Sequence, residues 1–178
     1  GFDQKESEEF FGSEEPYLPL ATRPDVLVFQ TEPLVEDLEV TGPVSVQLWI
    51  SSSAVDTDFT AKLVDVYPPS EDFPEGYALN LTDGILRVKF RDSWERTELM
   101  EPGKVYQIEL GLLPISNLFV KGHRIRLDIS SSNFPRFDVN GNTGENPGTS
   151  PVRITALNSV YHDETRPSHI LLPVIPAD

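Results

Sequence analysis

The stretch GHRIRLDISSSNFPRFDVNGNTG, residues 122–144, is the most informative part of this chain. It begins as a strand, because apolar and charged side chains alternate with a period of two. The side chains that share the core parity are His123, Ile125, Leu127 and Ile129, and those of the other parity are Arg124, Arg126 and Asp128. A loop follows, since Pro135 lacks an amide donor and Asn140-Gly141 favours left-handed backbone. We therefore predict a rigid strand that ends in a structured loop, the kind of segment that often carries function.

The same alternation recurs from Val26 onward and predicts further strands. They are expected over residues 44–50, 86–91 and 106–110, and near 26–31, 59–67, 152–160 and 168–175. Thr82-Asp83-Gly84 predicts a hairpin turn between strands at 77–81 and 85–91. No stretch has a sustained helical period. About eight or nine short strands of this kind predict an all-β sandwich of two antiparallel sheets.

Composition narrows the classes of partner. The chain has 178 residues, which suits one domain, and it has no cysteine for a disulfide or a thiol nucleophile. Its formal net charge of −15 argues against nucleic-acid and membrane-surface partners, because phosphates and anionic lipids would be repelled. No apolar run is long enough to span a membrane, and no signal-peptide pattern is visible, which slightly favours a cytoplasmic location.

Residues 1–25 differ from the rest of the chain. They are rich in acidic side chains, and Pro16 and Pro19 would break any helix. We expect them to form an acidic, loosely docked entry segment, with residues 26–178 as the folded domain. The alternative is a linker that lies against a preceding domain through its aromatic side chains, which are Phe2, Phe10, Phe11 and Tyr17.

No catalytic pattern stands out. The Gly-x-Ser-x-Gly elbow of α/β-hydrolases is absent, and the serines cluster at strand ends as 51–53 and 130–132, where small polar residues are usual. We expect His123 to be hydrogen-bonded at a sheet rim, His162 to lie in a turn and His169 to begin the last strand. Nothing in the spacing places a nucleophile beside a base. The chain is therefore expected to have no catalytic residue of its own.

Oxygen-bearing side chains at Asp138, Asn140 and Asn142 match the first three positions of a calcium loop. The match then fails, because Thr143 stands where a glycine would turn the loop and Thr149 where a glutamate would bind. The alternative is that these side chains hydrogen-bond the loop's own backbone. No pair of histidine or cysteine ligands suits zinc. We expect no metal and no cofactor, and keep the three oxygen-bearing residues as calcium candidates.

Three segments carry a resemblance to known hydrolases: DTDFTAKLVDV at 56–66, NLTDGI at 80–85, and the stretch at 122–144. In this order they resemble the C-terminal domain of the serine hydrolases typified by X-prolyl dipeptidyl-peptidase, cocaine esterase and α-amino-acid ester hydrolase. The resemblance runs from about Val26 to Val174. It implies a jelly-roll sandwich of the galactose-binding-like type. It also implies that the catalytic serine, aspartate and histidine lie in a preceding α/β domain, so none of them maps onto this chain.

The resemblance implies partners as well. The domain would pack on the α/β-hydrolase and helical cap domains of the same chain and help shape the rim of their substrate pocket, and a homo-oligomer is possible. The parent reaction would be acyl transfer from X-Pro peptides or acyl esters through a serine nucleophile. We expect an exposed apolar patch of roughly 600–1,500 Å² on the contact surface. The residues expected at the contact are Trp94, Phe134, Arg136, Phe137, Asp138 and Asn140.

A carbohydrate-binding module is the second interpretation, because jelly rolls frequently serve as lectin-like domains. Sugar stacking needs flat, exposed aromatic rings. Trp49 shares parity with Ser45 and Gln47, and Trp94 lies in a charged turn, so either ring could face outward. An outward ring equally marks a surface that another domain covers.

Overall fold

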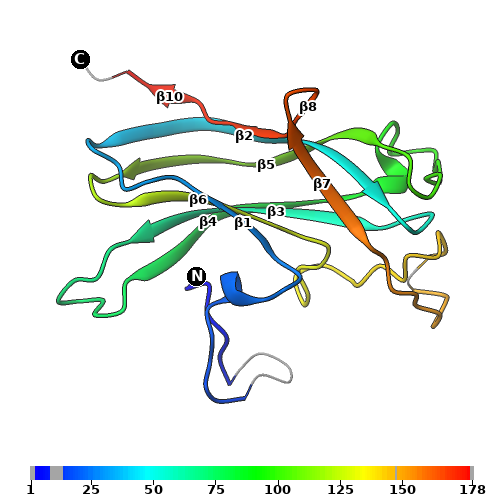
Figure 1. The fold of residues 1–178 in the computed structure, drawn as a ribbon, viewed down its shortest axis with the longest axis horizontal. Helices are drawn as coiled ribbons and strands as arrows, with labels where there is room; N and C mark the ends of the chain where they lie inside the picture. Colours follow the sequence, from blue (N-terminus) through cyan, green and yellow to red (C-terminus); the bar gives the residue numbers. More distant parts are fainter. Residues whose placement is uncertain (1–2, 9–13, 147, 177–178) are drawn as a thin grey trace.

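The computed structural model describes residues 3–8, 14–146 and 148–176, which form two antiparallel β-sheets packed face to face (Figure 1). The first sheet has the order β1 (Leu27–Gln30), β6 (Arg124–Ser130), β3 (Asp58–Tyr67), β4 (Tyr77–Arg87). The second sheet is built on β2 (Leu38–Ser52), which pairs with β5 (Tyr106–Phe119) on one edge and with β7 (Asn158–Asp163), β9 (His169–Leu171) and β10 (Val174–Ile175) on the other; β8 (Arg166–Pro167) pairs with β7. Among the described residues, no helix has the length and apolarity needed to cross a membrane.

The core lies between the two sheets and follows the predicted alternation. The buried apolar side chains include Val44, Val46, Leu48 and Ile50 of β2, Ile108 and Leu110 of β5, and Leu127 and Ile129 of β6. Period two puts these residues on one face of each strand, and burial of that face against the opposite sheet holds the layers together. The predicted all-β antiparallel sandwich is therefore confirmed.

The predicted hairpin at Thr82-Asp83-Gly84 is wrong. These residues lie inside β4, which runs without a turn along β3. Gly84 serves a close approach between the sheets, because a Cβ atom there would lie 2.9 Å from the carbonyl oxygen of Gly111 in β5. A glycine that resembles a turn residue in the sequence is thus explained by a contact with a strand far along the chain.

Two other element boundaries differ from the prediction. The alternation expected over 86–91 ends in a short 3₁₀ helix, η2 (Val88–Phe90), and Lys89 is buried there although its parity predicted exposure. The strand expected near 152–160 begins later, at the start of β7, and His162 belongs to that strand rather than to a turn. A second 3₁₀ helix, η1 (Leu20–Thr22), lies in the N-terminal part of the chain.

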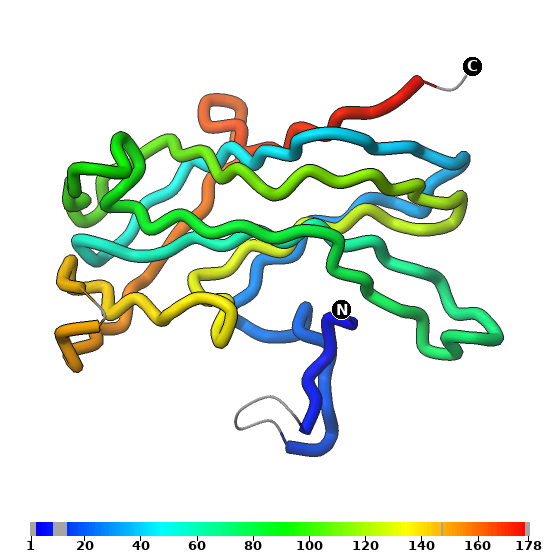
Figure 2. The backbone as a smooth tube through the Cα atoms, turned by 180° about the vertical axis from the view of Figure 1, so that it is seen from behind, coloured from blue at the N-terminus to red at the C-terminus, as the bar shows by residue number. Residues whose placement is uncertain are grey.

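The two long sides of the sandwich are unequal. On one side β4 and β5 run next to each other, as Figure 2 shows, and the hydroxyl of Thr82 donates to the carbonyl oxygen of Leu113 over 3.0 Å. On the opposite side, which faces the viewer in Figure 1, the first sheet ends at β1 and the second at β7, β9 and β10. The described sandwich is therefore closed by a strand contact on one side and open on the other.

Candidate interaction site

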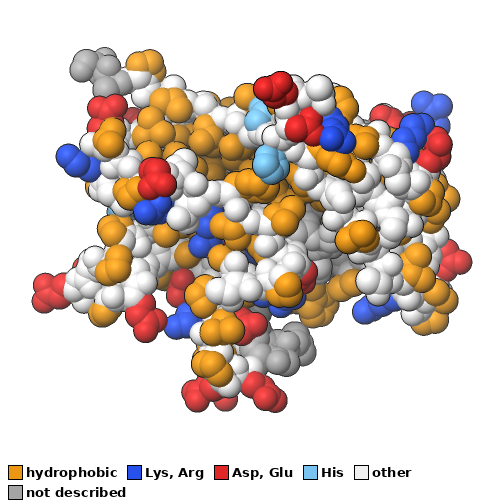
Figure 3. Space-filling view, viewed as in Figure 1, with side chains coloured by type: hydrophobic (Ala, Val, Ile, Leu, Met, Phe, Trp, Pro, Cys, Tyr) orange, Lys and Arg blue, Asp and Glu red, His pale blue; other side chains and the backbone are white. Residues whose placement is uncertain are grey.

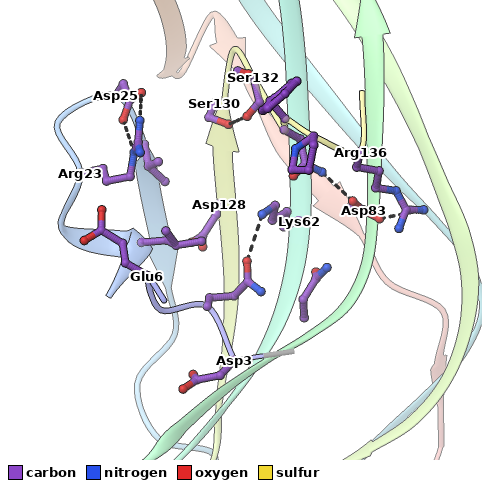
Figure 4. Close-up of a pocket in the computed structure, with 17 residues that line it drawn as sticks. Asp3, Glu6, Arg23, Asp25, Lys62, Asp83, Asp128, Ser130, Ser132 and Arg136 are labelled. Carbon is purple, nitrogen blue, oxygen red and sulfur yellow. Dashed lines mark hydrogen bonds and ion pairs between the residues drawn. The ribbon is translucent and has the colours of Figure 1, made fainter. Parts of the chain in front are cut away.

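A cleft of about 660 Å³ lies on the outer face of the first sheet (Figure 4). Side chains of β3, β4 and β6 form its floor, and the N-terminal segment and the loop after β6 form its walls. Each of the three segments that carry the family resemblance contributes to it: Lys62 comes from 56–66, Asp83 from 80–85, and several residues from 122–144. Segments far apart in the sequence therefore meet at one site.

Asp128 on the floor of the cleft and Arg126, its neighbour on the same face of β6, are charged but shielded from solvent. Arg126 and Asp128 keep only 6% and 5% of their surface exposed, although both lie on the face of β6 opposite the core. Their side chains form an ion pair, with Nη2 donating to Oδ2 over 3.0 Å. Burial raises the pKa of the Asp128 carboxyl, and Arg126 opposes that rise. The sequence pattern placed these residues on the correct face, but that face is covered.

Lys62 stands at the centre of this floor. Its ammonium donates to Oε1 of Gln4 over 3.0 Å. Burial lowers the pKa of Lys62, whereas the nearby carboxylates of Asp83 and Asp128 act in the opposite direction. Sequence reasoning did not select Lys62 or Asp83 as site residues. Their positions within two of the resemblance segments were the available indication.

The N-terminal segment is attached to the first sheet through Gln4. The amide of Gln4 donates to the carbonyl oxygen of Ala78 over 3.0 Å, and its carbonyl oxygen accepts from the amide of Leu20 over 2.8 Å. Gln4 is only 7% exposed. Of the aromatic residues expected to contact a preceding domain, Tyr17 is partly buried. The others, Phe2, Phe10 and Phe11, lie outside the described residues.

The loop after β6 forms the opposite wall. Asp83 accepts a hydrogen bond from Nδ2 of Asn133 over 2.6 Å, and its carboxylate lies 3.2 Å from Nη2 of Arg136. The guanidinium of Arg136 lies over the ring of Phe137, 5.6 Å from its centroid. Phe134 remains 54% exposed at the rim, and the peptide bond that follows it is cis. Three predicted contact residues, Phe134, Arg136 and Phe137, thus lie in one segment beside the cleft.

A buried polar network anchors the rest of this loop. Nδ2 of Asn140 donates to Oδ2 of Asp56 over 3.2 Å and to Oδ1 of Asp58 over 2.7 Å. Arg87 holds Asp58 through two hydrogen bonds of 2.9 Å, and Lys89 lies 3.5 Å from Asp56. Burial raises the pKa of Asp58, while Arg87 and Asn140 oppose the rise. The same hydrogen bonds to Asp58 raise the pKa of the Arg87 guanidinium. The network joins the loop to β3 and β4.

The three calcium candidates do not converge. Asp138 lies 3.1 Å from Arg87, Asn140 accepts from the amide of Asn142 over 2.9 Å, and Nδ2 of Asn142 donates to the carbonyl oxygen of Ile154 over 2.8 Å. Each side chain is thus engaged separately and stabilises the loop. Within residues 3–8, 14–146 and 148–176, no group of three or more His, Cys, Asp or Glu side chains could hold a metal ion.

Trp94 lies apart from the cleft. Its side chain is 77% exposed, and its ring stacks on that of Phe90 with a centroid distance of 6.5 Å. The neighbouring Lys89 donates to the carbonyl oxygen of Gly144 over 3.0 Å, so this turn is joined to the far end of the loop. Trp94 is not among the residues that line the cleft, whereas Phe134 is. Trp49, the other tryptophan of the carbohydrate interpretation, is half-buried.

The histidines have structural partners. Nδ1 of His123 lies 2.9 Å from the buried carboxylate of Asp65, which confirms the predicted hydrogen-bonded rim position. The ring of His162 packs edge-on against Phe29, with centroids 5.7 Å apart. Nδ1 of His169 lies 2.7 Å from the carbonyl oxygen of Pro167. Each of the three histidines thus has a hydrogen-bond or ring contact within the domain.

Comparisons with known proteins agree with this architecture. Residues 2–171 match the family model of the X-Pro dipeptidyl-peptidase C-terminal non-catalytic domain. The chain is 46% identical over 159 residues to the cocaine esterase of Rhodococcus sp. strain MB1 Bresler, a match that covers 88% of this chain and 27% of that protein.

Solved structures give the same picture. An aminopeptidase from the marine sediment archaeon Thaumarchaeota archaeon matches with a TM-score of 0.84 and 33% identity, over 88% of this chain and 27% of that one. An α-amino acid ester hydrolase matches with a TM-score of 0.83 and 34% identity, over 88% and 26%. The chain therefore spans about a quarter of the length of these relatives. With its two antiparallel sheets, this chain is a member of the X-Pro dipeptidyl-peptidase C-terminal non-catalytic domain family.

Proposed function

We propose that this domain packs, through the cleft and the loop beside it, on an α/β-hydrolase domain and its helical cap in the same polypeptide. The observation that carries the proposal is a set of charges on the outer face of a sheet, of which Asp83 and Asp128 are buried and Lys62 is half-buried. An outer face of an antiparallel sheet is normally solvated. Here its polar groups are already paired and ordered, and ordered polar groups lose little further entropy when another surface covers them.

The loop from Phe134 to Asn140 would then form part of the rim of the substrate pocket. Phe134 supplies an exposed aromatic ring, and the buried network around Asn140 holds the loop in position. We propose residues 1–25 as the entry segment and 26–178 as the body of the domain. Residue 3 lies at the cleft, so that a polypeptide preceding it would enter beside the proposed contact.

In this proposal the domain is a structural module of a serine hydrolase that acts on X-Pro peptides or acyl esters. The nucleophile, the base and the acid of the acyl transfer belong to the hydrolase domain. The 178-residue chain alone should hydrolyse neither an X-Pro-nitroanilide nor a nitrophenyl ester. Turnover that survived repurification and disappeared on substitution of a residue of this chain would overturn the non-catalytic role.

Phe134→Ala tests the proposed contact. In the isolated chain the ring is 54% exposed, so its removal should change the free energy of unfolding by about 1 kcal/mol or less. In the longer polypeptide the ring should be buried, and the same substitution should cost on the order of 2 kcal/mol. Leu157→Ala is the control, because Leu157 is 75% exposed and does not line the cleft. Equal small effects of Phe134→Ala in both settings would contradict the contact.

A further inference from the structure

β1 is an edge strand without the features that normally protect such edges. Among the described residues it pairs only with β6, in an unbroken register. Its sequence, Leu-Val-Phe-Gln, contains no charge and no proline. All four residues are exposed, with values of 44% for Leu27, 38% for Val28 and 37% for Phe29. An uncharged apolar edge is unexpected on a chain of net charge −15.

The register shows which backbone groups of β1 are free. The amide of Thr31 donates to the carbonyl oxygen of Ile125 over 3.0 Å. In an antiparallel pair the hydrogen-bonded positions alternate, so that the backbones of Leu27 and Phe29 also face β6. The amide and carbonyl groups of Val28 and Gln30 therefore point away from the sheet. They are in position to pair with one more strand.

The side chains of β1 border the open side of the sandwich. Phe29 lies opposite Leu127 in the register, and Leu27 lies opposite Ile129, so both share the core-facing side of the sheet. Phe29 packs edge-on against His162 of β7, but the second sheet covers these two side chains only in part, and Leu27 and Phe29 stay 44% and 37% exposed. Figure 3 shows hydrophobic side chains gathered over this side, between β10 and β1. The exposed apolar residues of the facing strands are Leu171, Val174 and Ile175.

β1 is also continuous with the cleft. Val28 lies opposite Asp128, which forms part of the cleft floor, and so Val28 belongs to the same outer face of the sheet. Val26, directly before the strand, lines the cleft as well. A domain that packs on the cleft would therefore lie beside the free edge of β1.

We propose that an extended segment of the hydrolase part of the same polypeptide adds to β1 as a fifth strand of the first sheet. This rests on the proposed function, which places that part at the cleft. The relatives are about four times as long as the region they share with this chain, which supplies the necessary polypeptide. Backbone pairing with Val28 and Gln30 would hold the strand, and alternate apolar side chains would fill the opening beside Phe29.

Hydrogen exchange at single amides tests the added strand. The measurement compares the 178-residue chain alone with the longer polypeptide. In the chain alone, the amides of Val28 and Gln30 should exchange quickly, and those of Phe29 and Thr31 slowly. In the longer polypeptide, Val28 and Gln30 should slow by on the order of 100-fold, because their amides gain a partner.

Two variants at position 28 sharpen the test. Val28→Pro removes an outward amide that β6 does not use, so the isolated chain should still fold. In the longer polypeptide it should return Gln30 to fast exchange. Val28→Thr, which keeps the amide and the strand preference, should leave Gln30 slow. If the proline variant is unfolded on its own, Val28→Lys takes its place, because a charge on the edge opposes strand addition.

The outcomes separate this inference from the function on which it rests. Slow exchange at Val28 and Gln30 only in the longer polypeptide supports the added strand. Protection of residues 133–137 without protection of these two amides overturns the added strand and leaves the cleft contact standing. No protection at either place overturns both. Protection in the isolated chain that grows with its concentration assigns the edge to a second copy and also overturns the proposal.

Discussion

Asn140→Ala should remove most of the anchoring of the loop after β6. The amide of Asn140 is 7% exposed and donates to two carboxylates, Asp56 and Asp58, that are 0% and 1% exposed. A hydrogen bond to a charged group contributes about 1.5–3 kcal/mol. Its removal also leaves buried carboxylates with fewer donors. Because Arg87 still pairs with Asp58, we expect a loss of about 3–5 kcal/mol in the free energy of unfolding rather than more.

Urea unfolding of the 178-residue chain at neutral pH measures this loss of free energy. Equal m-values for the variant and the parent chain establish that both unfold with the same exposure of surface. Asn117→Ala is the matched control. Its amide also donates to a buried carboxylate, that of Asp65, but through one contact of 3.4 Å. We expect that control to lose less than about 1 kcal/mol. Hydrogen exchange should report faster opening of residues 139–145 in Asn140→Ala than in the control.

Equal losses of unfolding free energy for Asn140→Ala and Asn117→Ala would refute the reasoning. They would show that the two hydrogen bonds of Asn140 stabilise the chain no more than the single 3.4 Å contact of Asn117 does. Asn140→Asp adds a further check. It places a third carboxylate beside Asp56 and Asp58, where like charges repel, and should destabilise the chain at least as much as alanine does. A neutral effect of Asn140→Asp would contradict this repulsion between the carboxylates.

Three further predictions concern the packing and charge of the sandwich. Leu127→Ala should lower the free energy of unfolding by about 2–5 kcal/mol, because it leaves a cavity in the core. Arg126→Ala should lower it by about 3–5 kcal/mol, because the buried carboxylate of Asp128 loses its partner. A small loss for Arg126→Ala in urea melts would mean that the outer face is solvated. Gly84→Ala should lower the free energy of unfolding by about 1–3 kcal/mol. Gly111→Ala is the control and should cost less in thermal melts, because its Cβ would meet nothing within 4 Å. A larger loss for Gly111→Ala than for Gly84→Ala would contradict the close approach of the two sheets at Gly84. Hydrogen bonds from Arg166 and Thr165 hold the pKa of Asp163 well below its usual range, so its contribution to stability is present above about pH 3.9 and is lost as pH falls through the lower folded value. Asp163→Asn should therefore flatten acid unfolding curves below that pH, and an unchanged acid limb would argue against the interaction.

The strands were predictable because alternation is a property of the extended backbone. Successive side chains point to opposite faces, so residues such as Leu48 and Leu127 could be assigned to the core from sequence spacing alone. The loop after β6 was also predictable, since Pro135 and Asn140-Gly141 cannot continue a strand. The resemblance then identified the family and pointed to Phe134 as a contact residue.

The cleft was decided by the tertiary structure. Alternation tells which face of a strand a residue occupies, but it does not tell what covers that face. Lys62 and Asp128 lie on faces that the pattern alone would leave in solvent. Gln4, 58 residues before Lys62, accepts a hydrogen bond from Lys62, and Asp128 is buried beside Arg126. Gly84 is a second case in which the local sequence was not sufficient. A glycine is favoured both in a turn and where two backbones approach closely, and the close approach to Gly111 is seen only in the tertiary structure. Both outcomes depend on contacts between distant segments, which local spacing does not contain.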